Sequence, residues 1–285
     1  EYTISTVCMP LRVSTKSIVW VWLILFISLS LSAAEKKPNF LFIAIDDMND
    51  WTGFLGGHPE AKTPNMDKLA SLGVNFSNAH CSAPGCSPSR NSLLFGIEPF
   101  KSGLYQFYEH KKLPVELMKS YTPVTEFLKD NGYNTYGSGK IHHRRNATAS
   151  EWTEFFPKGK ASLEFDAKDG YRHGNSTKSN FSPTLNPLRD HIDYKNTTFG
   201  VEVLKRKHDK PFFLGVGIIK PHLPFVAPKQ FFDLYPKEVE APKIKEGDLD
   251  DVPAVGRSMA KIPDDIKFTK DEAWTKVRRA YLACN

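Results

Sequence analysis

The stretch of this sequence with the most specific potential for chemistry is Cys86-Ser87-Pro88-Ser89-Arg90. Ser87 can cap a helix whose first turn holds Pro88, which needs no backbone partner there. Free backbone N–H groups and the positive end of the helix dipole would then face Cys86, where an oxyanion can bind. Arg90, one turn later, offers that anion a planar fork of donors. Cys86 is therefore a candidate nucleophile, while a buried thiol, half of a disulfide and a metal ligand remain alternatives.

Polar clusters also follow three apolar runs of the sequence: Asp46 and Asp47, then Lys140, His142 and His143, and finally Lys220 and His222. The aspartate pair offers carboxylate oxygens, which Ca²⁺ and Mg²⁺ prefer. The lysine and histidines can hold an anion and transfer a proton near neutral pH. Each cluster alone also has an ordinary explanation: a solvated turn or helix cap, a basic surface loop, and a packing histidine. Their common position after apolar runs is the stronger signal.

Strands that alternate with helices must position these clusters. The expected strands lie over residues 40–45, where the strand is buried on both faces, near residues 133–136 and over residues 211–219. One expected helix is capped by Thr63 or Asn65 and ended by Gly73, and another lies near residues 199–207. A further helix is capped by Thr122 and ended by Gly132, with Val124, Phe127 and Leu128 facing inward. Residues 157–190 are polar and predict an insertion or a long surface loop. The alternation predicts an α/β fold with a largely parallel sheet, in which sites form beyond the carboxyl ends of the strands.

The composition is that of a globular protein of one or two domains. The chain has 285 residues, of which 40% are hydrophobic, and a net charge of +6. No Lys/Arg block accompanies that charge, so the sequence predicts no nucleic-acid partner. Cys81, Cys86 and Cys284 are too few for a disulfide framework in a mature chain of this size, although a Cys81–Cys86 bridge is conceivable.

The first 34 residues predict export. Arg12 and Lys16 precede the apolar run 18–31, and Ser-Ala-Ala at residues 32–34 offers a cleavage site before Glu35. The run is shorter than the ~20 residues of a membrane helix, so no stable membrane span is expected. We expect residues 1–34 to comprise upstream residues, with Met9 as the start, plus a signal peptide. The mature protein would be periplasmic or secreted.

The segment around Cys86 resembles the sulfatase signature Cys-x-Pro-Ser-Arg-x-x-x-Leu-x-Gly, since Leu94 and Gly96 also match. Other segments are similar to characteristic segments of that family: "FIAIDD", "GSGKIHH" and "KPHLPF". Their sequences are most similar to those of the iduronate-2-sulfatase-like bacterial members. The resemblance covers residues 39–285. It implies an alkaline-phosphatase-like α/β sandwich with a central, mostly parallel sheet, of which residues 35–285 would form the N-terminal portion of the catalytic domain.

The resemblance also implies a mechanism. A formylglycine-generating enzyme would oxidise Cys86 to Cα-formylglycine, whose hydrate attacks sulfur, and Ca²⁺ (or Mg²⁺) would bind Asp46, Asp47 and residue 86. Arg90 and Lys140 would neutralise the sulfate. The base would be His143, which we favour, or His142, and the residue on the leaving-group side would be His222.

The implied function is hydrolysis of sulfate esters on a sugar or polysaccharide. No later Asp-His-Gly or Asp-Asn segment follows a strand, nor is there a second sulfate-binding lysine, so the resemblance implies a chain truncated at its carboxyl end. A phosphate or phosphonate ester hydrolase of the same superfamily is one alternative. A non-catalytic fragment that binds sulfated glycans is the other.

Overall fold

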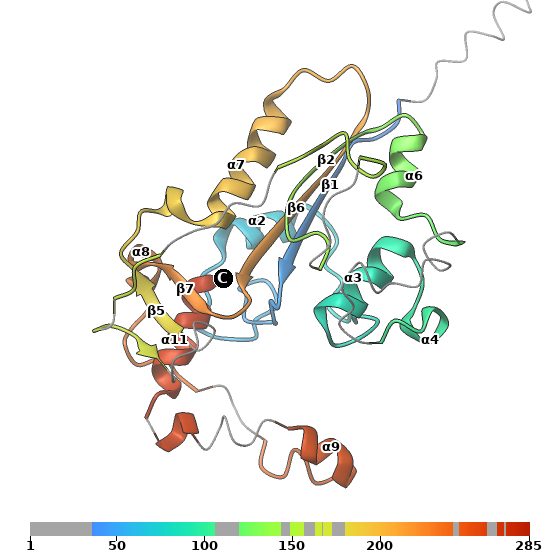
Figure 1. Cartoon of the computed structure of the whole chain (residues 1–285). Helices are drawn as coiled ribbons and strands as arrows, with labels where there is room; N and C mark the ends of the chain where they lie inside the picture. Colours follow the sequence, from blue (N-terminus) through green and yellow to red (C-terminus); the bar gives the residue numbers. More distant parts are fainter. Residues whose placement is uncertain are drawn as a thin grey trace, which may run out of the picture. The chain divides into compact units, whose positions relative to one another are not determined.

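The computed structural model describes residues 36–105, 120–143, 149–156, 163–166, 168–172, 180–241, 245–260, 267–270 and 272–285 (Figure 1). The chain divides into two compact units, Glu1–Pro38 and Asn39–Asn285, and the fold below is that of the second. The expected signal peptide lies outside the described residues. Within the described ranges, no helix has both the length and the apolar character needed to cross a bilayer.

The centre of the second unit is a parallel sheet. Its order is β1 (Phe40–Asp46), β6 (Phe212–Pro221), β2 (Asn134–Gly139) and β3 (Glu154–Phe155). Every neighbouring pair of these strands is parallel. The alternating strands and helices therefore build the α/β architecture that the sequence predicts.

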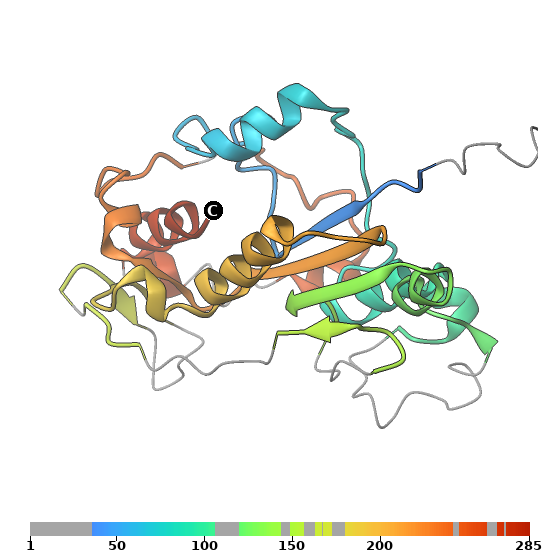
Figure 2. The same ribbon diagram turned by 90° about the horizontal axis from the view of Figure 1, so that it is seen from above.

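Alternating side chains of β6 pack against different layers. Phe212, Leu214 and Val216 share one apolar cluster with Phe199 and Val203 of α7 (Ile192–Lys205). Their neighbour Phe213 joins a separate cluster instead, with Leu94 of α3 (Cys86–Phe95), Ile141 and Trp152. Successive side chains of a strand point to opposite faces, so the sheet lies between two packed layers. Figure 2 shows α7 running along the sheet.

A smaller sheet forms a second packed region. It has the order β4 (Tyr171–Arg172), β5 (Asn180–Thr184) and β7 (Phe225–Pro228). Two helices pack on it, α8 (Lys229–Phe232) and α11 (Trp274–Cys284) (Figure 1). All five residues of β5 are buried. The prediction of a surface loop over residues 157–190 is therefore wrong for β5, because polar side chains there bond to one another, as Ser182 does to Asn180.

The edge position of β1 also differs from the prediction. Phe40, Leu41 and Ile43 keep 42%, 51% and 45% of their surface exposed, so the expected burial on both faces is wrong. Within the described residues β1 pairs only with β6. An apolar run indicates that a strand tends to be buried, but it does not indicate how many neighbouring elements cover that strand.

Helix boundaries follow the predicted punctuation more closely. The helix α2 (Pro64–Leu72) begins after Thr63 and ends at Gly73, as expected. The helix α6 (Val124–Asp130) is capped by Pro123, so the expected Thr122 cap is wrong by one residue. Its Val124 and Phe127 are exposed, contrary to the predicted inward face, whereas Leu128 packs against the apolar cluster of Leu94 and Phe213 as predicted. The short elements are α4 (Pro99–Ser102), the 3₁₀ helix η3 (Leu188–Asp190) and α9 (Ala254–Met259).

Candidate active site

The carboxyl ends of three neighbouring strands bring the predicted clusters together. In the register of the sheet, Asp46 at the end of β1 pairs with Pro221 at the end of β6. The backbone N–H of His222 donates to the carbonyl of Asp46 at 3.1 Å. Lys140 follows the last residue of β2, on the other side of β6. Because parallel strands end at one edge, residues 46, 140 and 222 meet there.

Two glycines allow β2 and β6 to approach closely at this edge. Gly139 has φ +68°, and a Cβ atom there would lie 1.9 Å from the carbonyl oxygen of Gly217. A Cβ atom on Gly217 would lie 2.3 Å from the backbone of Lys140. The close approach lets the N–H of Lys140 donate to the carbonyl of Gly217 at 3.1 Å. Only glycine at both positions places Lys140 beside the end of β6.

The helix α3 supplies the cysteine. Its cap is Gly85 in an extended conformation and Cys86 is its first residue, so the prediction that Ser87 caps the helix is wrong. Ser87 is instead buried in the first turn, with 1% of its surface exposed. The helix ends at Gly96, which adopts the left-handed conformation at φ +65°. The side chain of Cys86 therefore lies at the positive end of a ten-residue helix.

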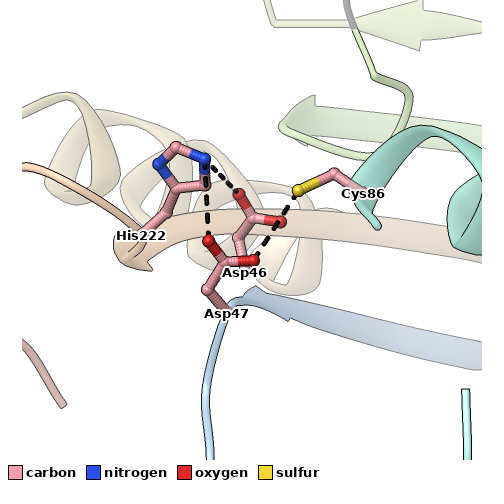
Figure 3. Close-up of side chains that lie close together, drawn as sticks. All are labelled: Asp46, Asp47, Cys86 and His222. Carbon is pink, nitrogen blue, oxygen red and sulfur yellow. Dashed lines mark hydrogen bonds and ion pairs between the residues drawn. The ribbon is translucent and has the colours of Figure 1, made fainter. Parts of the chain in front are cut away.

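Four side chains converge at the sheet edge (Figure 3). One ligand atom from each of Asp46, Asp47, Cys86 and His222 lies within 4.8 Å of all the others, and we call these residues the Asp-Cys-His cluster. The Cys86 thiol lies 3.6 Å from Oδ1 of Asp47. Nε2 of His222 lies 3.6 Å from Oδ2 of Asp47 and 4.0 Å from Oδ2 of Asp46. Carboxylates, a sulfur and an imidazole are all metal-ligating groups, so this donor set can hold a divalent cation.

Two cations hold Asp46. Nη2 of Arg90 donates to Oδ1 of Asp46 at 2.7 Å, and Nζ of Lys140 donates to Oδ2. Burial alone would raise the pKa of Asp46, but the hydrogen bonds and charges of Lys140 and Arg90 outweigh it and leave that pKa below its usual value. Asp46 is thus an ionised carboxylate although only 2% of its surface is exposed.

Arg90 also braces the loop after β2. Its Nη1 donates to the carbonyl of Ile141 at 3.2 Å and to the carbonyl of Lys140. The guanidinium fork is therefore directed at Asp46 and at this backbone. The sequence predicted a sulfate-neutralising arginine, and in the structure Arg90 reaches the Asp-Cys-His cluster through Asp46.

The Cys86 side chain is a protonated thiol in this environment. Burial raises its pKa; Lys140 opposes that shift, while Asp46 and Asp47 add to it. The reactive form of cysteine is the thiolate, which a raised pKa disfavours. Cys81, Cys86 and Cys284 are all free, so the conceivable Cys81–Cys86 bridge does not form in this structure. The surroundings of Cys86 therefore do not favour nucleophilic attack by its thiol sulfur.

His142 and His143 lie in the loop after β2, and the contacts of His142 indicate where its ring is directed. His142 is buried, and its Nε2 lies 3.1 Å from Oε2 of Glu151, which has no exposed surface. Thr125 donates to the same carboxylate oxygen at 3.0 Å. The rings of His142 and Trp152 pack nearly perpendicular to each other. The ring of His142 is therefore directed at a buried carboxyl group, and the Asp-Cys-His cluster includes neither His142 nor His143.

Sequence reasoning missed the residues that hold the His222 segment. The carboxylate of Asp193, in the first turn of α7, accepts the N–H groups of Ile219 and Lys220, both at 2.9 Å. Nζ of Lys220 then donates to the carbonyls of His222, at 3.1 Å, and of Pro224. The acidic residue in a helix first turn was visible in the sequence, but its partners lie 26 and 27 residues away.

A second missed residue is Tyr281, in α11. Its hydroxyl donates to the carbonyl of Asp47 at 3.1 Å and accepts the N–H of Asn49 at 2.8 Å. These partners are more than 230 residues away in the sequence, so no local pattern could have found them. Burial raises the pKa of Tyr281 to about 12, which keeps its hydroxyl protonated at neutral pH.

Comparison with known proteins places this geometry in a family. The family model described as Sulfatase matches residues 38–284. A sulfatase of Formosa agariphila is 33% identical over 266 residues, which cover 87% of this chain and 52% of that protein. Human iduronate 2-sulfatase is 27% identical over 312 residues, covering 96% of this chain and 55% of that protein. The chain spans about half the length of these curated relatives.

Solved structures show the same fold. The phosphonate monoester hydrolase of Agrobacterium radiobacter superposes with a TM-score of 0.61 at 17% identity, covering 87% of this chain and 56% of that one. A protein solved with its substrate D-glucosamine-2-N,6-O-disulfate gives a TM-score of 0.53 at 15% identity, covering 87% and 59%. These likenesses agree with the α/β fold that the resemblance implied. From the family model and the 33% identical relative, the chain belongs to the sulfatase family.

Proposed function

We propose that the protein containing this chain hydrolyses sulfate esters on a sugar or polysaccharide. The observation that carries the proposal is the convergence of Asp46, Asp47, Cys86 and His222 within 4.8 Å at the carboxyl edge of the sheet. Relatives named iduronate 2-sulfatase and ulvan-active sulfatase support a sulfated carbohydrate as the substrate class.

Residue 86 is the proposed nucleophile after conversion of its thiol to an aldehyde. The raised pKa of Cys86 speaks against a thiolate, whereas the hydrate of an aldehyde carries two hydroxyl groups at the same position. One hydroxyl attacks sulfur and the alcohol of the sugar leaves. The second hydroxyl then loses its proton and expels sulfate, which restores the aldehyde. The conversion requires a formylglycine-generating enzyme as a partner.

A divalent cation, Ca²⁺ or Mg²⁺, is the proposed resident metal. Asp46, Asp47 and residue 86 would hold it. Ca²⁺ and Mg²⁺ prefer oxygen ligands, so the sulfur of Cys86 suits them less than the oxygen that replaces it in the aldehyde hydrate. Such a cation would polarise the sulfate oxygens and acidify a bound hydroxyl. The side chains of Lys140 and Arg90 add positive charge next to Asp46.

Proton transfer falls to the histidines. His222 belongs to the Asp-Cys-His cluster and is the proposed residue on the leaving-group side. His143 is the proposed base at residue 86. The 3.1 Å approach of His142 to the buried Glu151 supports this choice, because that ring is already engaged away from the cluster.

Export is part of the proposal, because residues 1–34 have the composition of a signal peptide. The protein would act in the periplasm or outside the cell, where sulfated polysaccharides are found.

Production through the export route of a host with formylglycine-generating activity tests the proposal. Mass spectrometry of the peptide that contains residue 86 should show an aldehyde, and sugar sulfates should be hydrolysed faster than the matching phosphates. An active enzyme with an unmodified thiol at Cys86 would refute the mechanism. Faster phosphate or phosphonate hydrolysis would favour the ester hydrolase alternative. Binding of sulfated glycans without turnover by the aldehyde form would favour a non-catalytic module.

A further inference from the structure

A distant side chain, that of Tyr281, binds the backbone of the loop that carries Asp47. The single hydroxyl of Tyr281 donates to the carbonyl of Asp47 and accepts the N–H of Asn49. The hydroxyl thereby bridges two backbone groups of the turn that follows β1. The side chain of Asp47 points toward those of Asp46, Cys86 and His222 (Figure 3). Its backbone carbonyl accepts a hydrogen bond from Tyr281 of α11.

The backbone of Asp47 needs such support. Its φ is +60°, one of two positive φ values at non-glycine residues in the described part of the chain. A left-handed conformation at a residue with a side chain is unfavourable and persists where surrounding contacts hold it. Two hydrogen bonds of Tyr281 act on the backbone at this left-handed residue, one at the carbonyl of Asp47 and one at the N–H of Asn49.

The helix α11 holds Tyr281 firmly. The residues on either side of it, Ala280 and Leu282, have 0% and 1% of their surface exposed. Its ring meets the edges of Trp51 and Phe225, with centroids 5.4 Å and 5.2 Å away. A side chain fixed on both sides by a packed core presents its hydroxyl at a constant place.

We propose that Tyr281 is a positioning residue for the cation site, because its hydroxyl holds Asp47 in the conformation that directs the carboxylate to the Asp-Cys-His cluster. The inference rests on the proposed cation. Partners that orient metal ligands typically change metal affinity by about 10–100-fold when they are removed.

The test compares two tyrosine-to-phenylalanine variants of the chain. Tyr281→Phe keeps the ring packing and removes the hydroxyl. Tyr235→Phe is the matched control, because Tyr235 is buried in the apolar cluster that contains Ala280 and Leu282, the neighbours of Tyr281, and its hydroxyl bonds to the backbone of Lys62. Calorimetric titration with Ca²⁺ should show binding about 10–100-fold weaker for Tyr281→Phe and unchanged for Tyr235→Phe.

Equal Ca²⁺ affinity of Tyr281→Phe and the unsubstituted chain would overturn the inference and leave the proposed function standing. If the unsubstituted chain binds no Ca²⁺, the proposed cation site fails in this chain, and hydrogen exchange of the Asn49 amide decides the inference. Exchange about five- to tenfold faster in Tyr281→Phe supports the positioning role, and unchanged exchange contradicts it.

Discussion

Replacement of Arg90 by methionine should destabilise the chain strongly. The change keeps an unbranched apolar stem and removes the guanidinium that donates to Asp46 and to the carbonyls of Lys140 and Ile141. Asp46 would keep Lys140 as its only charged hydrogen-bond partner among those described for its carboxylate.

The burial of the pair sets the magnitude. The side chains of Arg90 and Asp46 have 9% and 3% of their surface exposed, so little solvent screens them. Removal of one partner from a buried pair costs about 3–5 kcal/mol. Because Lys140 remains beside Asp46, we expect the lower end, about 3 kcal/mol.

A surface pair in the same chain is the control. Arg206 and Glu154 approach to 2.5 Å, but their side chains are 38% and 45% exposed. Solvent screens such a pair, so Arg206→Met should cost less than about 1 kcal/mol. Urea denaturation at pH 7 measures both free energies of unfolding. A loss below about 1 kcal/mol for Arg90→Met, or equal losses for the two variants, would show that burial of the pair does not govern its contribution.

Three other outcomes are expected. Cys86→Ala should abolish sulfate release and Cys81→Ala should retain much of it, as an assay of exported, aldehyde-containing enzyme would show; equal losses would contradict the nucleophile assignment. Gly139→Ala should destabilise more than Gly132→Ala in urea denaturation, because both have positive φ but only at Gly139 would the Cβ atom meet backbone, at 1.9 Å. Burial and the charge of Lys220 lower the pKa of His191, so its contribution to stability is full above its unfolded pKa, about 6.5, and is lost as the pH falls through its folded pKa. His191→Gln should therefore reduce the loss of stability between pH 7 and pH 5; an unchanged pH dependence would refute this.

The sequence alone determined the fold class and showed that the candidate site residues follow the carboxyl ends of strands. Apolar runs alternating with helices predicted parallel strands, and the polar residues after those runs had to meet at one edge because parallel strands end together. The Cys86 segment predicted a helix start, and the structure places Cys86 at the first residue of α3. These are local signals, which the chain carries in its neighbouring residues.

The tertiary structure decided which of these ends are neighbours. The order β1, β6, β2 places His222 beside Asp46 and brings Lys140 to the same carboxylate, and no spacing in the sequence encodes that order. It also decided that His142 meets Glu151 and that Tyr281 holds the backbone of Asp47. Periodicity reports whether a residue tends to be buried, whereas the identity of its partner depends on packing between segments that are far apart in the chain.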